Sequence, residues 1–176
     1  MRCFLAVDLD DEIRERVESL QVKLGLKNVN GIKAVEKQNL HVTLVFLGEK
    51  DEDEVKSIVK KLNGIKPGFE VEFRGVGVFP NQNYIRVVWL GVDGRLLELG
   101  HEIRRALGMK EEGREEVPHV TLARVKRKVP ELTELRKRIE ENADVVIGKQ
   151  MVRRFCLKKS VLRPEGPVYA DLAVFG

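Results

Sequence analysis

The sequence lacks several features that mark common classes of protein. Cysteine is present only as Cys3 and Cys156, too few for a disulfide framework or a cysteine-based metal site. No apolar run approaches the roughly 20 residues that a membrane-spanning helix needs. Acidic residues begin already at Asp8, which predicts that no signal peptide is present. We therefore expect a cytoplasmic protein that does not enter a membrane.

Motifs of ATP-driven and serine-based enzymes are also missing. The chain contains no Gly-x-x-x-x-Gly-Lys-Ser/Thr loop, no Gly-x-Gly-x-x-Gly and no Gly-x-Ser-x-Gly elbow. Gly75-Val76-Gly77 lies in a strand-like run and lacks the third glycine. Histidine is scarce as well, with three in the chain, so the position of each one is informative.

The length and charge of the chain suit one globular domain with a polyanionic partner. The chain has 176 residues, 43% of them hydrophobic, which predicts a single domain over residues 1–176 with a buried core. The net charge is +4, but residues 124–176 hold 13 Lys and Arg against 7 Asp and Glu. This excess fits RNA, although on charge alone a solvated basic surface is the simpler explanation.

Hydrophobic spacing predicts helices and strands in alternation. Apolar residues three and four apart indicate four amphipathic helices: one capped by Asp8 and Asp10 and buried through Ile13–Leu24, one that begins at Asp51 with a capping box to Glu54, one over Leu96–Leu107, and one that opens at Pro130. Strands are expected at residues 2–7, 31–35, 40–47, 69–79, 84–92 and 117–125, with further strands from about 144 to the end.

The tetrapeptide His-Val-Thr-Leu occurs twice, at residues 41–44 and 119–122. Each copy lies on an expected strand, with an amphipathic helix before it and another after it. This order is typical of a duplicated split βαβ unit. The sequence therefore predicts a bilobal α+β fold, built from two ferredoxin-like units whose two antiparallel sheets face a central cleft.

Side-chain alternation groups the polar residues of each copy. In a strand, His41 shares one face with Thr43, and His119 shares one face with Thr121. We also place Arg124, five positions after His119, on the same face of the strand as His119. If the two units meet about a pseudo-twofold axis, all five side chains converge on one site.

This set of side chains suits in-line displacement at phosphorus. One imidazole can accept a proton from an attacking water while the other donates a proton to the leaving oxygen. Hydroxyls of Thr43 and Thr121 can donate to phosphate oxygens, and Arg124 can neutralise their charge. No metal or cofactor is needed. A zinc site made of His41, His119 and a carboxylate is the alternative, but it leaves the threonines without a role.

At these motifs the sequence resembles the 2H phosphoesterases, and among them the RNA 2′,3′-cyclic phosphodiesterase family, also called 2′-5′ RNA ligase. The likeness extends over the whole chain. Besides the two motifs, it is carried by Arg2-x-Phe4-x-Ala6, Asn39-Leu40, Phe46-Leu47-Gly48, Pro118, Arg124 and the tail Arg163-Pro164-Glu165-Gly166-Pro167-x-Tyr169.

The resemblance implies hydrolysis of 2′,3′-cyclic phosphates to 2′-phosphomonoesters, and a slow ATP-independent reverse reaction that joins RNA ends through a 2′-5′ bond. It implies that His41 is the proton donor and His119 the proton acceptor, with Thr43, Thr121 and Arg124 holding the phosphate. The residue types alone leave the order of the two histidines open. The expected partner is RNA with a cyclic phosphate end, such as tRNA halves, and the expected state is a monomer.

Three other readings of the site stay open at this point. The substrate could be a small cyclic nucleotide, in which case the chemistry is the same and only the affinity for longer RNA differs. The protein could instead bind nucleotides or RNA without turnover, although binding alone does not require two acid–base groups. Finally, ligation could be the physiological direction. The third histidine, His101, lies off the apolar stripe of its helix, and we expect it to be solvated.

Overall fold

The computed structural model describes residues 1–111, 117–126 and 132–176, and within these ranges the chain forms nine strands, four α-helices and one short 3₁₀ helix. The strands are β1 (Arg2–Asp8), β2 (Ile32–Ala34), β3 (His41–Glu49), β4 (Phe69–Asn81), β5 (Tyr84–Asp93), β6 (His119–Val125), β7 (Val146–Val152), β8 (Phe155–Arg163) and β9 (Gly166–Phe175). The helices are α1 (Asp11–Lys23), η1 (Lys37–Asn39), α2 (Glu52–Leu62), α3 (Leu96–Ala106) and α4 (Leu132–Glu141).

Local sequence signals place most of these elements. The predicted capping box of α2 is present: the Glu54 backbone N–H donates to Asp51 Oδ1, and the Asp51 N–H donates to Glu54 Oε2, both at 2.8 Å. The predicted side-chain cap of α1 is absent. Asp10 is the N-cap by position, but its side chain makes no capping hydrogen bond. The predicted start of α4 at Pro130 lies outside the described residues.

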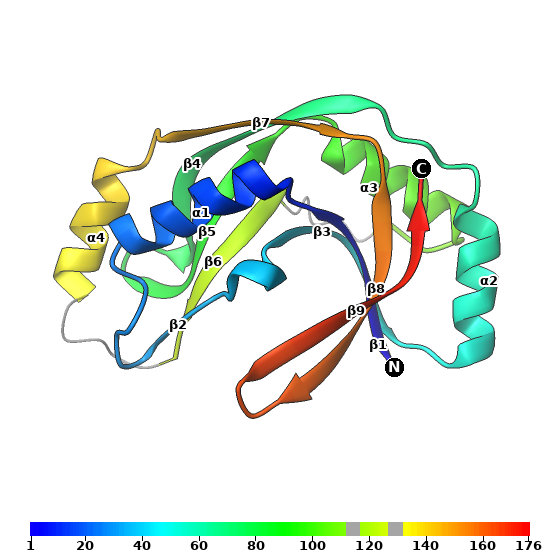
Figure 1. The fold of residues 1–176 in the computed structure, drawn as a ribbon, viewed down its shortest axis with the longest axis horizontal. Helices are drawn as coiled ribbons and strands as arrows, with labels where there is room; N and C mark the ends of the chain where they lie inside the picture. The colour runs from blue at the N-terminus through cyan, green and yellow to red at the C-terminus, as the bar shows by residue number, and fades with distance from the viewer. Residues whose placement is uncertain (112–116, 127–131) are drawn as a thin grey trace.

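The strands form one sheet in which every pairing is antiparallel, in the order β7-β4-β5-β6-β3-β1-β8-β9, with β2 on β6. The α+β class and the duplicated architecture predicted from the sequence are confirmed. The two predicted sheets are two arms of one curled sheet, because β3 and β6 pair at Val42 and Val120, the second residues of the two repeated tetrapeptides. Figure 1 shows the arms curving away from this junction.

Two elements pack on the arm opposite to the strand that they adjoin in the chain. Helix α1 follows β1 in the chain but packs on β7, in the other arm, where α4 packs on β4. Helix α3 packs on β3, and α2 packs on α3 (Figure 1). Strand β2 likewise precedes β3 in the chain but pairs with β6. Each lobe therefore contains segments from both halves of the sequence.

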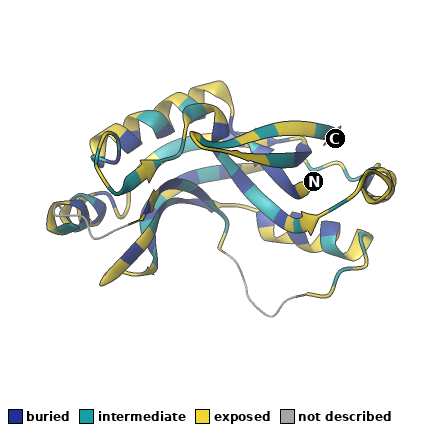
Figure 2. Cartoon of the chain, turned by 90° about the horizontal axis from the view of Figure 1, so that it is seen from below, coloured by how far each residue is buried: buried dark blue, intermediate teal, exposed yellow. Residues whose placement is uncertain are grey.

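The apolar core lies between the helices and one face of the sheet. One buried cluster extends through both arms, with Leu5, Phe73, Leu122, Ile139 and Leu157 among its fully enclosed members. Figure 2 shows buried colour along the strands and exposed colour on the outward sides of the helices. Among the described helices, none has the length and hydrophobicity that crossing a bilayer requires. The opposite face of the sheet carries the polar and aromatic side chains that line a cleft.

Candidate active site

All five side chains predicted for the site line one cleft of about 1390 Å³ on the sheet face opposite the core: His41, Thr43, His119, Thr121 and Arg124. Strands β3 and β6 are neighbours at the centre of the sheet, which brings together two motifs that are far apart in the chain. The convergence expected from strand alternation and pseudo-twofold symmetry is thus present in the structure.

Both imidazoles are held by the same backbone contact. His41 Nδ1 lies 2.6 Å from the carbonyl oxygen of Asn39, and His119 Nδ1 lies 2.8 Å from that of Val117. A carbonyl oxygen can only accept, so Nδ1 carries the hydrogen in each ring. Nε2 is therefore the atom left to exchange a proton, and in His41 it lies 3.0 Å from Thr43 Oγ1.

Aromatic rings enclose His41. Phe4 and Tyr169 lie with their ring centroids 5.2 and 5.3 Å from the imidazole, and 5.1 Å from each other. Phe4 comes from β1 and Tyr169 from β9, so the enclosure depends on strands from both ends of the chain. It restricts the motion of the imidazole and excludes water from its sides.

A second aromatic pair flanks His119, and no sequence motif marked it. The Phe79 ring stands edge-on to the imidazole at 5.2 Å, and the Trp89 centroid lies 6.4 Å away. Trp89 fits because Gly77 stands opposite it in the β4–β5 pair: a Cβ on Gly77 would lie 2.1 Å from the indole. Gly77 belongs to the Gly75-Val76-Gly77 run, which does not form a nucleotide-binding motif. Its lack of a side chain makes room for the Trp89 ring beside His119.

A β-bulge brings Arg124 to the cleft. Strict alternation turns a residue five positions after His119 to the opposite face, so the expectation that alternation alone places Arg124 beside His119 is wrong. Trp89 pairs with Thr121 but Val88 pairs with Ala123, which leaves one extra residue in β6. This irregularity reverses the alternation and returns Arg124 to the side of His119.

His41 differs electrostatically from the residue it matches in sequence. Burial lowers its pKa, and the positive charge of Lys158 lowers it further, as does His119. The hydrogen bond to Asn39 and the charge of Asp8 oppose these effects without cancelling them. In the free protein His41 is therefore neutral at neutral pH.

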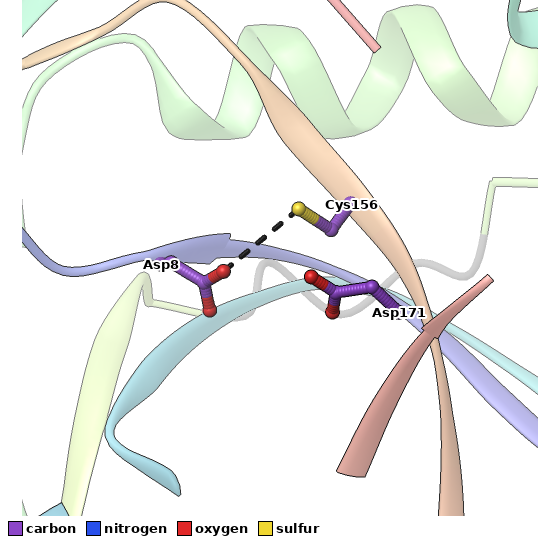
Figure 3. A group of neighbouring side chains, drawn as sticks. All are labelled: Asp8, Cys156 and Asp171. Carbon is purple, nitrogen blue, oxygen red and sulfur yellow. Dashed lines mark hydrogen bonds between the residues drawn. The ribbon is translucent and has the colours of Figure 1, made fainter. Parts of the chain in front are cut away.

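A partly buried ion cluster lies beside His41. Lys158 Nζ is 2.6 Å from Asp171 Oδ1 and 3.1 Å from Asp8 Oδ1, so one ammonium joins strands β8, β9 and β1. Figure 3 shows the two carboxylates beside Cys156, whose Sγ is 3.8 Å from Asp8 Oδ2. Burial raises the pKa of the Cys156 thiol to about 11, which keeps it protonated and a poor metal ligand. The ammonium bridges both carboxylates and offsets one of their two negative charges, and we interpret the three groups as a structural ion cluster.

The described part of the chain offers no set of zinc ligands that includes His41 and His119. There, the one group of three candidate ligand residues with mutually close atoms is Asp8, Cys156 and Asp171, which includes neither His41 nor His119. The third histidine, His101, is exposed as expected, with Nδ1 3.3 Å from Glu111 Oε1 at the rim of the cleft.

Known proteins match this chain over almost its whole length. The family described as LigT like phosphoesterase matches residues 7–89 and again 91–169. A protein of Archaeoglobus fulgidus named RNA 2′,3′-cyclic phosphodiesterase is 41% identical over 181 residues, which is 99% of each chain. One of Methanocaldococcus jannaschii with the same name is 42% identical over 173 residues, 96% of each chain.

Solved structures share the fold. The Thermus thermophilus protein TT0787 superposes with a TM-score of 0.80 at 31% identity, over 99% of this chain and 97% of its own. Escherichia coli LigT, in a crystal with 3′-AMP, superposes with a TM-score of 0.76 at 27% identity, over 98% of this chain and 95% of its own.

Proposed function

The chain belongs to the LigT-like phosphoesterase family, and from this premise we propose that it opens 2′,3′-cyclic phosphate ends of RNA to 2′-phosphomonoesters. The family resemblance in the sequence is confirmed, and the family and the names of its relatives support a 2′,3′-cyclic phosphodiesterase activity. One observation carries the assignment of the site: two His-x-Thr pairs face a single cleft, each with its Nδ1 bound to a backbone carbonyl and its Nε2 left for proton transfer.

The proposed step moves two protons and exchanges one P–O bond for another. His119 Nε2 accepts a proton from water as the water oxygen attacks phosphorus. The P–O3′ bond breaks, and His41 Nε2–H donates its proton to the leaving 3′ oxygen. Thr43 and Thr121 donate to the non-bridging oxygens, and Arg124 neutralises the charge that grows on them. Return of one proton from His119 to solvent restores the free site, and His41 takes up its proton from solvent when the next substrate binds.

The lowered pKa of His41 bears on this assignment. A general acid must hold a proton when the substrate is bound, whereas the free imidazole is neutral at neutral pH. The negative charge of a bound phosphodiester favours the imidazolium and so raises the pKa. We therefore infer that the substrate itself brings the donor into its protonated form.

Ligation uses the same geometry. If the 5′-hydroxyl of a second RNA replaces water, loss of its proton to His119 and cleavage of the P–O3′ bond form a 2′-5′ phosphodiester without ATP. tRNA halves that end in a cyclic phosphate are one candidate pair of substrates, and a monomer contains the complete set of proposed residues.

The test is a steady-state assay on a three-nucleotide RNA that ends in a 2′,3′-cyclic phosphate, run beside 2′,3′-cyclic AMP. His41→Ala and His119→Ala should each lower kcat by about 100-fold or more while leaving the thermal unfolding midpoint little changed. His101→Ala, the matched exposed histidine, should keep full activity. Full turnover by His41→Ala, or no turnover by a folded wild type that still binds RNA, would contradict the proposal. Activity that disappears with EDTA and returns with zinc would instead support a zinc site that includes His41 and His119.

A further inference from the structure

Two cations stand side by side in the cleft, on strands β2 and β6. Lys33 is directly opposite Arg124 in the β2–β6 pair, and both side chains are exposed and line the cleft. Like charges that face each other across a pair of strands destabilise a sheet. Among the described residues no carboxylate forms an ion pair with either side chain, although Glu36 and Glu165 also line the cleft. The pair is therefore unfavourable in the free protein, which indicates that it serves to bind an anion.

The short strand β2 fixes Lys33 in this position. It pairs with β6 beyond the point where β3 pairs with the same strand. Val35, which follows β2, donates its N–H to the Leu122 carbonyl at 2.9 Å, so the backbone next to Lys33 is also bonded to β6. On the other side, Lys33 Cε lies 3.9 Å from the place of a Cβ on Gly166, the first residue of β9. The stem of Lys33 thus lies between the two arms of the sheet.

Strand register places the two cations on the His41 side of the reaction centre. The register of the antiparallel β3–β6 pair puts His41 level with Thr121, which is three residues before Arg124 along β6. His119 is five residues before Arg124. At about 3.3 Å per residue, the cations are roughly 10 Å along β6 from the level of His41 and roughly 16 Å from His119. They are therefore closer to the proposed proton donor than to the proposed acceptor.

This position fits one particular phosphate of the substrate. If His41 protonates the leaving 3′ oxygen, the terminal ribose lies on the His41 side of the reacting phosphorus, and so does the phosphate on the 5′ oxygen of that ribose. Arg124 is assigned to the reacting phosphate, which leaves the charge of Lys33 for a second one. We propose that Lys33 binds the phosphate that joins the terminal nucleotide to the nucleotide before it. An ammonium on a flexible stem suits this contact. The inference rests on the proposed function, and it makes Lys33 a determinant of the preference for RNA over a mononucleotide.

The test compares two substrates that differ by one phosphate. One is 2′,3′-cyclic AMP, and the other is the same nucleotide with a methyl phosphate on its 5′ oxygen, which has the single negative charge of an RNA linkage. Lys33→Met should lower kcat/KM for the 5′-phosphorylated substrate by about 10-fold and leave kcat/KM for 2′,3′-cyclic AMP unchanged. Lys33→Arg keeps the charge and should restore most of the loss. Arg124→Met, at the reacting phosphate, should lower kcat/KM for both substrates.

Two controls separate a local contact from general electrostatics and from folding. Lys56→Met removes an exposed lysine of α2 outside the cleft and should change neither substrate. Lys33→Met should not lower the thermal unfolding midpoint, because it relieves the repulsion from Arg124. A lower midpoint together with an equal loss on both substrates would mean that Lys33 supports the fold, and it would overturn the proposed contact.

The wild type distinguishes failure of this inference from failure of the proposed function. A folded wild type that opens neither substrate would overturn the proposed function. A wild type that opens both with equal kcat/KM would overturn the role of Lys33 by itself. Titration with the two 2′-phosphate products measures the contact without turnover: the 5′-phosphorylated product should bind about 10-fold more weakly to Lys33→Met than to the wild type, whereas equal affinity would exclude the contact.

Discussion

At the scale of single residues, the two histidines of the site are equivalent in sequence and unequal in environment. Both rings donate Nδ1–H to a backbone carbonyl two residues earlier. Burial and the charge of Lys158 nevertheless lower the pKa of His41. Nε2 of His41 is therefore unprotonated in the free protein, and a bound phosphate must raise this pKa before His41 can act as the proposed donor.

We predict that the pKa of His41 in the free protein lies below the ordinary value near 6.5 and rises when inorganic phosphate binds, because the anion stabilises the imidazolium. By linkage, phosphate should bind more tightly as the pH falls from the raised pKa of His41 in the complex toward its lowered pKa in the free protein. Nitrogen-detected NMR titration of His41 with and without phosphate measures both effects, with His101 as the exposed reference. A His41 pKa that stays constant or falls on phosphate binding would argue against its role as donor.

The lowered pKa also has a consequence for stability. The unfolded chain takes up a proton near pH 6.5, whereas folded His41 takes it up only at lower pH. Acidification through this window therefore favours the unfolded state and lowers the free energy of unfolding, while above about pH 6.5 the contribution of His41 is fully present.

At the scale of elements, one ammonium holds three strands in register beside the site. Lys158 of β8 lies between Asp8 of β1 and Asp171 of β9, and Asp8 stands opposite His41 in the β1–β3 pair. The ammonium is buried while both carboxylates are partly exposed. Removal of the cation therefore leaves two acidic groups close together without a partner, and it also removes a charge that acts on His41.

Lys158→Met should lower the free energy of unfolding by roughly 2 kcal/mol and raise the pKa of His41, since a positive charge disappears and Asp8 loses its cation. Chemical denaturation and the NMR titration of His41 measure the two effects. Lys159→Met, at the next position of β8, is the matched control and should change both values much less. Equal stability of the two variants would mean that the cluster contributes nothing net to the fold.

At the scale of the whole molecule, the exchange of elements ties the lobes together. Helix α1 and strand β2 leave one arm and pack on the other, and one apolar cluster extends through both arms. Neither half of the sequence can complete its own lobe. The cleft between the arms thus lies on a body whose two sides must fold together.

Thermal unfolding should accordingly show one transition, with equal calorimetric and van't Hoff enthalpies. Asp51→Ala removes the capping box of α2, in one lobe, and should lower the stability of the entire molecule by about 1 kcal/mol without splitting the transition. Differential scanning calorimetry of both proteins checks this. A second transition, or a shift in only part of the heat absorption, would mean that the lobes unfold separately.

The sequence by itself determined the features that depend on short-range spacing. Apolar residues three and four apart marked the helices, the Asp51–Glu54 pair marked the start of α2, and the duplicated tetrapeptide marked the strands that carry His41 and His119. These features were predictable because helix and strand periods act over a few neighbouring residues, and because two identical segments in similar contexts imply a common face.

Only the tertiary structure decided what depends on pairing between distant segments. The junction of the arms at Val42 and Val120, the bulge that turns Arg124 into the cleft, and the rings beside each histidine all arise from strand register. The lowered pKa of His41 arises from burial under chain segments more than a hundred residues away, including β8 and β9. Register and burial are properties of the assembled sheet, since a shift of one residue reverses which side chains face the cleft.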